Sequence, residues 1–155
     1  RVFEQSHPSI TFALALDDSL PPFNLDREQL GRALINLLDN AVASVQLAAQ
    51  ANIGGVQDSG PHANISVRTK YDPELGLASL TVADCGTGIA EEDKPRLFEP
   101  YFSKKREGTG LGLAIVRTIV ADHNGFIRVR NNEPRGAVFV IELPVTREAQ
   151  AVRHA

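Results

Sequence analysis

Two pairs of strand-like segments constrain the fold of this chain more than any other feature. The first pair spans 63–71 and 77–84, and the second spans 126–131 and 137–143. In the first pair, apolar and polar residues alternate with the two-residue period of a half-buried strand. The connections DPELG and NNEPRG are short and rich in turn-forming residues. We therefore expect hairpins and a mixed or largely antiparallel sheet.

Strand and helix patterns follow each other in an order that defines the layers. Residues 10–16 alternate like a further strand, and residues 27–50 repeat apolar side chains at a helical period after the plausible N-cap Asp26. A short acidic helix is expected over 91–97 and another helix over about 111–123. This order predicts an α+β fold, a two-layer α/β sandwich whose mixed, largely antiparallel sheet is covered on one face by helices.

The long helical segment carries an unusual polar group. Its apolar residues form one stripe: Leu30, Leu34, Leu37, Leu38, Ala41 and Val45. Asn36, Asp39 and Asn40 are expected together on a roughly opposite face. Two asparagines one turn apart are odd in a helix interior, because Asn prefers caps and turns. Taken alone they favour a solvated polar face, although their amide oxygens suit Mg²⁺ beside phosphate oxygens and water.

A glycine-rich stretch, EGTGLGLAIVRTIVADHN at 107–124, leads without a break into the second long helix. Gly108, Gly110 and Gly112 leave backbone N–H groups accessible next to the positive end of a helix dipole, and both features suit phosphate. The spacing fits neither a P-loop nor a dinucleotide-binding turn. It indicates either a phosphate site of a third kind or a hinge before a helix. Asn124-Gly125 is expected to end that helix.

Asp84 stands at the end of a predicted strand and is followed by Gly86 and Gly88. A carboxylate there could accept hydrogen bonds from a ligand amine, while the glycines let the backbone approach a flat ring closely. By itself an Asx-type turn that closes the strand is the better interpretation. The basic run 104–106 could likewise meet phosphate charge, but alone such a run is more often a solvated loop.

Composition excludes several classes. The 155 residues suffice for one domain with one core, and 43% hydrophobic with 23% charged residues is typical of a globular protein. A net charge of −3 gives no reason to expect nucleic acid, and no apolar run is long enough to span a bilayer. The single cysteine, Cys85, excludes an internal disulfide framework and a cysteine-based zinc site, and favours a reducing, intracellular compartment.

Four motifs together carry a resemblance. NLLDNA, DCGTGI, FEPYF and GTGLGL occur in this order, and the arrangement resembles the ATP-binding catalytic domain of bacterial sensor histidine kinases. That family belongs to the GHKL group of gyrase, Hsp90, MutL and histidine kinases, which share the Bergerat fold. The long helix and short lid look most like the nitrogen-regulation kinases of the NtrY and NtrB type. The resemblance implies a catalytic and ATP-binding domain over 1–145 and a C-terminal tail over 146–155.

The resemblance also implies roles for individual residues. Asn40 would be a Mg²⁺ ligand, with Asn36 beside it, and Lys105 would meet the terminal phosphates; these three would form the catalytic group. Asp84 would bind the adenine amino group, and Phe98 and Phe102 would anchor a lid running through Lys105 to Glu107. The implied ATP-binding set is Asn36, Asn40, Asp84, Gly86, Gly88, Ile89, Phe98, Phe102, Lys105, Gly108, Thr109, Gly110, Leu111 and Gly112.

The implied function is transfer of the γ-phosphate of Mg-ATP to a histidine in a separate dimerisation and phosphoacceptor domain, a helical hairpin. His7, His62, His123 and His154 do not lie in the setting of that phosphoacceptor. The implied partners are this hairpin and a downstream response regulator, with no nucleic acid and no membrane contact by the domain. We expect a cytoplasmic domain that is monomeric in isolation and part of a homodimeric kinase.

Three other interpretations remain open. One is an ATP-hydrolysing conformational switch of the gyrase, Hsp90 or MutL kind, but such relatives carry a water-activating glutamate where Asn36 stands, and an amide cannot accept the proton. The others are an anti-sigma-factor-type serine kinase and a degenerate module without nucleotide. Val138 is a departure from the kinase pattern, since Thr or Ser is common there.

Overall fold

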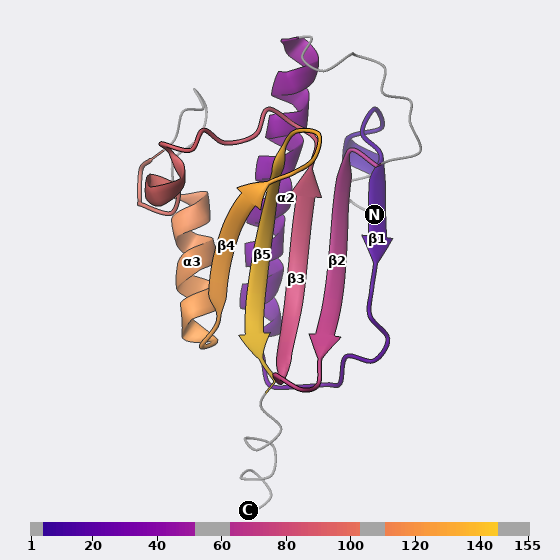
Figure 1. Cartoon of the computed structure of the whole chain (residues 1–155), viewed down its shortest axis with the longest axis vertical. Helices are drawn as coiled ribbons and strands as arrows, with labels where there is room; N and C mark the ends of the chain where they lie inside the picture. Colours follow the sequence, from indigo (N-terminus) through magenta and orange to yellow (C-terminus); the bar gives the residue numbers. More distant parts are fainter. Residues whose placement is uncertain (1–4, 52–62, 103–110, 146–155) are drawn as a thin grey trace, which may run out of the picture.

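The computed structural model describes residues 5–51, 63–102 and 111–145. The named elements are β1 (Phe12–Ala15), α2 (Arg27–Gln50), β2 (Ile65–Asp72), β3 (Leu77–Asp84), the 3₁₀ turn η1 (Lys94–Arg96), α3 (Gly112–Asp122), β4 (Phe126–Asn131) and β5 (Ala137–Pro144). Figure 1 shows the strands side by side with α2 behind them.

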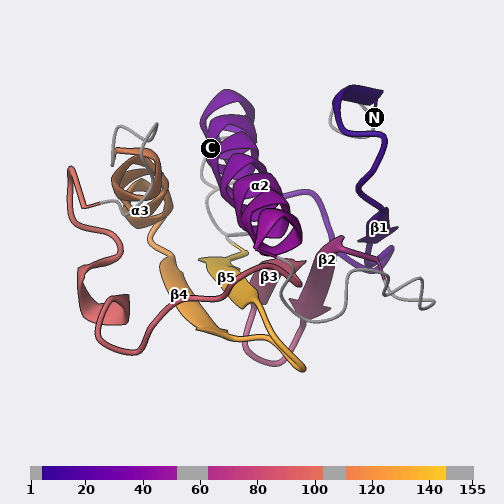
Figure 2. The ribbon, with the colours of Figure 1, turned by 90° about the horizontal axis from the view of Figure 1, so that it is seen from above.

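The sheet has five strands in the order β1-β2-β3-β5-β4. β1 runs parallel to β2, and all other neighbours are antiparallel. Seen from above, α2 and α3 lie on the same face of this sheet (Figure 2). The predicted α+β sandwich with a mixed, largely antiparallel sheet is therefore confirmed.

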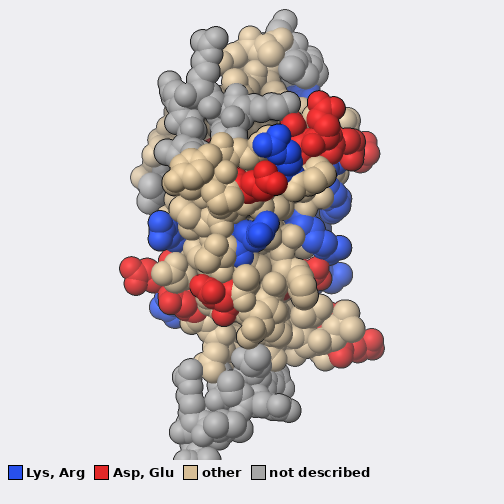
Figure 3. Space-filling model, turned by 90° about the vertical axis from the view of Figure 1, so that its left-hand side faces the viewer, with Lys and Arg blue, Asp and Glu red and all other residues tan. Residues whose placement is uncertain are grey.

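Charged side chains of both signs are interspersed on the face that carries α3 (Figure 3). Within the described ranges, no helix is long and apolar enough to cross a membrane.

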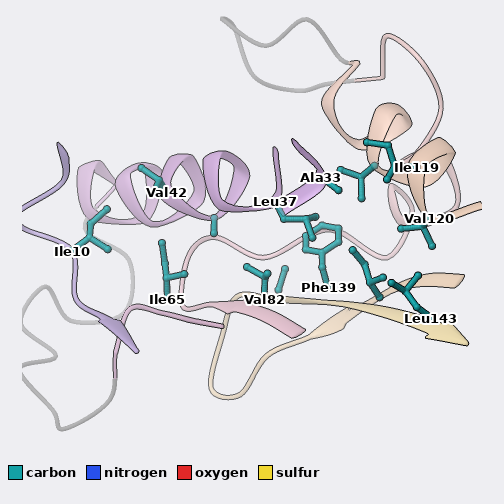
Figure 4. Packing of buried hydrophobic residues seen from close by; sticks show 14 residues of the cluster. Ile10, Ala33, Leu37, Val42, Ile65, Val82, Ile119, Val120, Phe139 and Leu143 are labelled. Atoms are coloured by element: carbon teal, nitrogen blue, oxygen red, sulfur yellow. The ribbon is translucent and has the colours of Figure 1, made fainter. Parts of the chain in front are cut away.

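The core lies between the sheet and the two helices (Figure 4). Val82 of β3, Phe139 and Ile141 of β5 and Leu37 of α2 belong to one buried cluster, and all four are at most 4% exposed. α3 adds Val116, Ile119 and Val120 to the same cluster. Burial of these apolar side chains holds the helical layer against the strands.

Helix α2 begins as predicted, because the carboxylate of Asp26 accepts a hydrogen bond from the backbone N–H of Gln29 at 3.0 Å. Its polar face differs from the prediction. Asp39 is exposed, whereas Asn36 and Asn40 are half-buried. The reason is tertiary: α3 packs beside α2, and the Asn36 side chain reaches the first turn of α3.

Helix α3 ends in a Schellman motif. The N–H of Gly125 bonds to the carbonyl of Val120 and that of Asn124 to the carbonyl of Ala121, both at 2.9 Å. Asn124 takes the left-handed conformation, with φ 60°. Gly125 serves close packing instead, since a Cβ there would lie 2.4 Å from the Glu142 carbonyl oxygen of β5. The predicted helix end is confirmed to within a residue.

Two predicted elements are shorter than expected. The acidic helix over 91–97 is wrong in extent, because turns precede a three-residue 3₁₀ segment, Lys94–Arg96. Pro95 lacks the N–H that a regular helix would need beyond its first turn. The first strand covers 12–15 rather than 10–16. It is an edge strand whose ladder stops where the chain bends, with the Asp17 N–H bonded to the Thr69 hydroxyl.

Candidate functional site

β3 ends and β5 begins at the upper end of the sheet in Figure 1. The end of β3 lies next to the start of β5, because Ala83 pairs with Val138 in an antiparallel register. The turn after β3 contacts α2, and α2 contacts the start of α3. Sheet topology therefore brings together motifs that are far apart in the sequence.

Asp84 is the one charged side chain buried among the described residues, at 3% exposure. Its Oδ1 atom accepts hydrogen bonds from the backbone N–H of Gly86 at 2.8 Å and from that of Ala137 at 3.3 Å. The first bond is the Asx-type turn that the sequence suggested as the alternative to a ligand site. The two interpretations are compatible, since this turn fixes the orientation of a buried carboxylate, and a fixed carboxylate can recognise an amine.

The glycines after Asp84 let the chain run directly against α2. A Cβ on Gly86 would lie 2.1 Å from the Ser44 hydroxyl oxygen and 2.5 Å from the Ser44 carbonyl carbon. Gly88 has φ 76°, a conformation that favours glycine. Ile89 then packs partly buried against the core. The loop of residues 84–88, the DCGTG loop, is thus closely packed on its α2 side.

Ser44 is a member of the site that the sequence did not reveal. Its hydroxyl accepts a hydrogen bond from the Thr87 N–H at 3.0 Å and lies 3.3 Å from the Thr87 hydroxyl. Ser44 follows Asn40 by four residues and so lies one turn further along α2. This four-residue spacing was the signal in the sequence that could have identified Ser44 as a site residue. It places Asn40 one helical turn from Ser44, the residue of α2 that the DCGTG loop contacts.

The hairpin between β4 and β5 supplies further contacts that sequence reasoning missed. The side-chain amide of Asn132 donates to the Asp84 carbonyl at 2.8 Å, and Nε of Arg135 donates to the Cys85 carbonyl at 2.9 Å. Gly136, with φ 108°, approaches so closely that a Cβ would lie 1.9 Å from the Asp84 carbonyl oxygen. No local pattern signals these contacts, because they span about fifty residues.

Asn36 links α2 to the start of α3. Its side-chain nitrogen lies 3.4 Å from the Gly112 carbonyl oxygen, a long hydrogen bond. The N-cap residue of α3, Leu111, makes no side-chain capping hydrogen bond. A Cβ on Gly112 would meet nothing within 4 Å. The Asn36 side chain therefore lies beside the first turn of α3.

The segment after the DCGTG loop is attached to the sheet by its aromatic residues. Phe98 packs edge-to-face on Phe139, with ring centroids 6.3 Å apart and an interplanar angle of 85°. The Arg96 guanidinium lies 4.8 Å above the Phe102 ring. Both aromatic residues of this anchor are half-buried. The predicted anchoring of Phe98 therefore corresponds to a contact with the core.

A polar cluster joins the same segment to β4. The Lys94 ammonium bonds to the Glu91 carboxylate and, at 2.9 Å, to the side-chain oxygen of Asn131. The hydrogen bond from Lys94 lowers the pKa of Glu91, and that from Asn131 adds to the effect. This cluster fixes the chain before Phe98.

Some predicted site residues cannot be placed. Lys105, Gly108, Thr109 and Gly110 lie outside the described residues, as does the rest of 103–110. Val138, the departure from the kinase pattern, is buried at 2% exposure beside the end of β3 and carries no hydroxyl. A groove of about 650 Å³ between α2 and α3 is lined by Leu111 and Arg32 and does not include Asp84.

Comparison with known proteins defines the class. Residues 25–147 match the family described as histidine kinase-, DNA gyrase B- and HSP90-like ATPase, and the chain belongs to this family. It is 37% identical over 136 residues to the sensor histidine kinase ZraS of Escherichia coli strain K12, covering 88% of this chain and 26% of ZraS. It is 36% identical over 143 residues to the sensory histidine kinase/phosphatase NtrB of Azospirillum brasilense, covering 92% of this chain and 35% of NtrB.

Solved structures of histidine kinases have the same fold as this chain. The mycobacterial sensor histidine kinase MprB superposes with a TM-score of 0.71 at 30% identity, covering 93% of this chain and 87% of that one. The fold is therefore that of histidine kinase catalytic domains. The chain spans about a quarter to a third of the curated relatives ZraS and NtrB.

Proposed function

We propose that this chain is the catalytic domain of a sensor histidine kinase, which binds Mg-ATP and donates its γ-phosphate to a histidine of a separate helical-hairpin domain. The observation that carries the proposal is the buried Asp84 carboxylate, oriented by two backbone N–H groups at the end of the sheet. Family membership supports ATP use. A similar solved structure, full-length ShkA, is a complex with AMPPNP.

At the adenine end, Asp84 would accept a hydrogen bond from the exocyclic amino group. Its Oδ1 atom already serves Gly86 and Ala137, and each carboxylate oxygen has two lone pairs for further donors. Gly86 and Gly88 would shape the pocket wall, with Ile89 beside them. A charged acceptor makes this hydrogen bond stronger than a neutral one.

At the phosphate end, Asn40 would hold Mg²⁺, with Asn36 as a second candidate. Both amides are half-buried on α2, and that of Asn36 reaches the start of α3. Neutral amide oxygens fit Mg²⁺, which keeps several waters and shares phosphate oxygens. Bound there, the ion would neutralise phosphate charge. Within the described residues, no cluster of three His, Cys, Asp or Glu offers another metal site.

The lid and the phosphate loop complete the proposed site. Phe98 and Phe102 would anchor a lid that carries Lys105 to the terminal phosphates. The loop Gly108–Gly112, with Thr109 and Leu111, would line the phosphate chain at the start of α3. These residues would hold the nucleotide in line for transfer. Because Asn36 cannot act as a base, phosphoryl transfer to histidine is favoured over hydrolysis.

The wider setting is part of the same proposal. We place the domain at 1–145 and a tail at 146–155, in the cytoplasm and without membrane contact. The parent kinase would be a homodimer that passes phosphate to a response regulator. The similar kinase ThkA has been solved in complex with the response regulator protein TrrA. Assignment to the NtrB and NtrY type is one choice among several, since ZraS is equally similar.

Mixing the chain with a separately produced phosphoacceptor hairpin and γ-labelled ATP tests the proposal. Label on a hairpin histidine supports it. Release of free phosphate alone would indicate a hydrolase, and absence of ATP binding would reject a nucleotide site altogether. In calorimetry, Asp84→Asn should weaken ATP binding by about 10- to 100-fold, the equivalent of one charged hydrogen bond. Asn40→Ala should abolish the Mg²⁺ dependence of ATP binding, and an unchanged dependence would exclude Asn40 as the ligand.

A further inference from the structure

The DCGTG loop is held from a second side, away from α2, by the hairpin between β4 and β5. Asn132 and Arg135 of this hairpin donate to two successive carbonyls, those of Asp84 and Cys85. Both bonds are short, at 2.8 and 2.9 Å, and both side chains are half-buried. The two hydrogen bonds therefore fix the main chain at Asp84 and Cys85, directly next to the Asp84 side chain.

The donor on Asn132 is itself oriented. Its side-chain oxygen accepts a hydrogen bond from the Glu133 N–H at 2.9 Å, while its side-chain nitrogen donates to the Asp84 carbonyl. The backbone N–H of Asn132 donates separately to the Gly136 carbonyl at 3.0 Å. With the oxygen and the nitrogen of the amide both bonded, the side chain has one favourable orientation. The hairpin is thus a rigid support for the loop.

The same hairpin leads into the residue that orients the Asp84 carboxylate. Ala137, which begins β5, donates its N–H to Oδ1 of Asp84 at 3.3 Å. Gly136 packs directly against the Asp84 carbonyl, so that the hairpin and the loop are in close backbone contact. A shift of the hairpin therefore moves both the main chain and the carboxylate of Asp84.

We propose that Asn132 and Arg135 are positioning residues for adenine selectivity: without touching the nucleotide, they hold the Asp84 carboxylate where it meets the 6-amino group. This inference rests on the proposed function. Without the two bonds, the carboxylate is misaligned with the amine, and a misaligned hydrogen bond loses most of its strength. Contacts to ribose and phosphate, which the hairpin does not support, persist.

The test compares ATP with inosine triphosphate, which carries a carbonyl oxygen in place of the 6-amino group and so offers Asp84 no donor at the 6-position. Calorimetry with Mg²⁺ measures both affinities for the parent chain and for Asn132→Asp and Arg135→Ala. The first variant keeps the acceptor for Glu133 and removes the donor to Asp84. Each variant should lower the ATP-to-inosine triphosphate affinity ratio by about 5- to 10-fold, as loss of one aligned hydrogen bond requires, while inosine triphosphate affinity stays within about twofold.

The controls separate positioning from general damage. Arg130→Ala removes the same charge from an exposed position on β4 and should leave the ratio unchanged. Arg135→Lys, which retains a donor, should recover part of the ratio. Equal loss of affinity for both nucleotides would mean a merely structural role and would overturn the inference.

Asp84→Asn distinguishes failure of the inference from failure of the proposed function. If this variant leaves the ratio intact, adenine recognition by Asp84 is wrong and the function must be reconsidered. If it collapses the ratio while Asn132→Asp and Arg135→Ala preserve it, the proposed function stands and the positioning role is rejected.

Discussion

Substitution of Gly136 by alanine probes the closest approach in the site. Gly136 has φ 108°, a conformation that L-residues rarely adopt. An added Cβ would lie 1.9 Å from the Asp84 carbonyl oxygen, 2.7 Å from its carbonyl carbon and 2.9 Å from the Cys85 Cα. All three atoms belong to the backbone, so no side-chain rotation can relieve the overlap.

The cost has two parts. A non-glycine residue in such a backbone region costs about 1–3 kcal/mol. Overpacking against backbone that must shift costs about 1–3 kcal/mol more. The sum, about 2–6 kcal/mol, is a large part of the 5–15 kcal/mol that typically stabilises a domain. At roughly 2–4 °C for each kcal/mol in a chain of this size, the Tm should fall by about 5–20 °C.

Two other glycines provide matched controls. Gly76 also has positive φ, at 64°, but an added Cβ meets nothing within 4 Å, so alanine there should cost only the strain of about 1–2 kcal/mol. Gly31 lies inside α2 with open space around it, and alanine there should stabilise by up to about 1 kcal/mol.

Urea denaturation and thermal unfolding would rank the three variants, and calorimetry would follow ATP binding. We expect the order Gly31→Ala, Gly76→Ala, Gly136→Ala from most to least stable, with weakened ATP binding in the last alone. The reasoning is refuted if Gly136→Ala unfolds no more easily than Gly76→Ala, because the clash with Asp84 would then be absent.

Three further predictions concern the fold. Leu37→Ala should destabilise by about 2–5 kcal/mol in urea denaturation, because the side chain is fully buried; a cost below 1 kcal/mol would contradict this packing. Asp26→Ala should cost about 1 kcal/mol through loss of the α2 cap, with ATP affinity retained. Hydrogen bonds from Ser19 and Tyr71 lower the pKa of Asp17 below 3.8. The stability that ionised Asp17 contributes is therefore complete above the unfolded pKa of 3.8 and is lost as pH falls through the lower pKa of the folded state. Asp17→Asn should therefore make the free energy of unfolding depend less on pH below about pH 4. Parallel curves of unfolding free energy against pH for the variant and the parent would contradict this.

Much of the fold was predictable because it depends on local signals. The two-residue alternation identified the strands of the first hairpin, and the helical period of 27–50 matched α2 at both ends. Asp26 was recognisable as a cap because a cap acts on the N–H groups of the next turn. The helix expected over 91–97 is wrong in extent, because Pro95 lacks the N–H of a regular helix and leaves only the 3₁₀ segment Lys94–Arg96.

The candidate site was predictable in part. The motif order pointed to Asp84, which is buried at the end of β3, and to the asparagines of α2, of which Asn36 reaches the start of α3. The sequence did not reveal that Asn36 and Asn40 are half-buried, because the burial of side chains on α2 depends on how α3 packs against it.

The residues that support the site were decided by tertiary structure alone. Ser44 meets Thr87 across 43 residues, and Asn132 and Arg135 meet the DCGTG loop across 48 and 50. Sequence by itself determined which segments are strands and helices, and which motifs mark the family. Which side chains hold Asp84 depended on strand order and register, because β5 pairs beside β3 only once the chain between them has folded back.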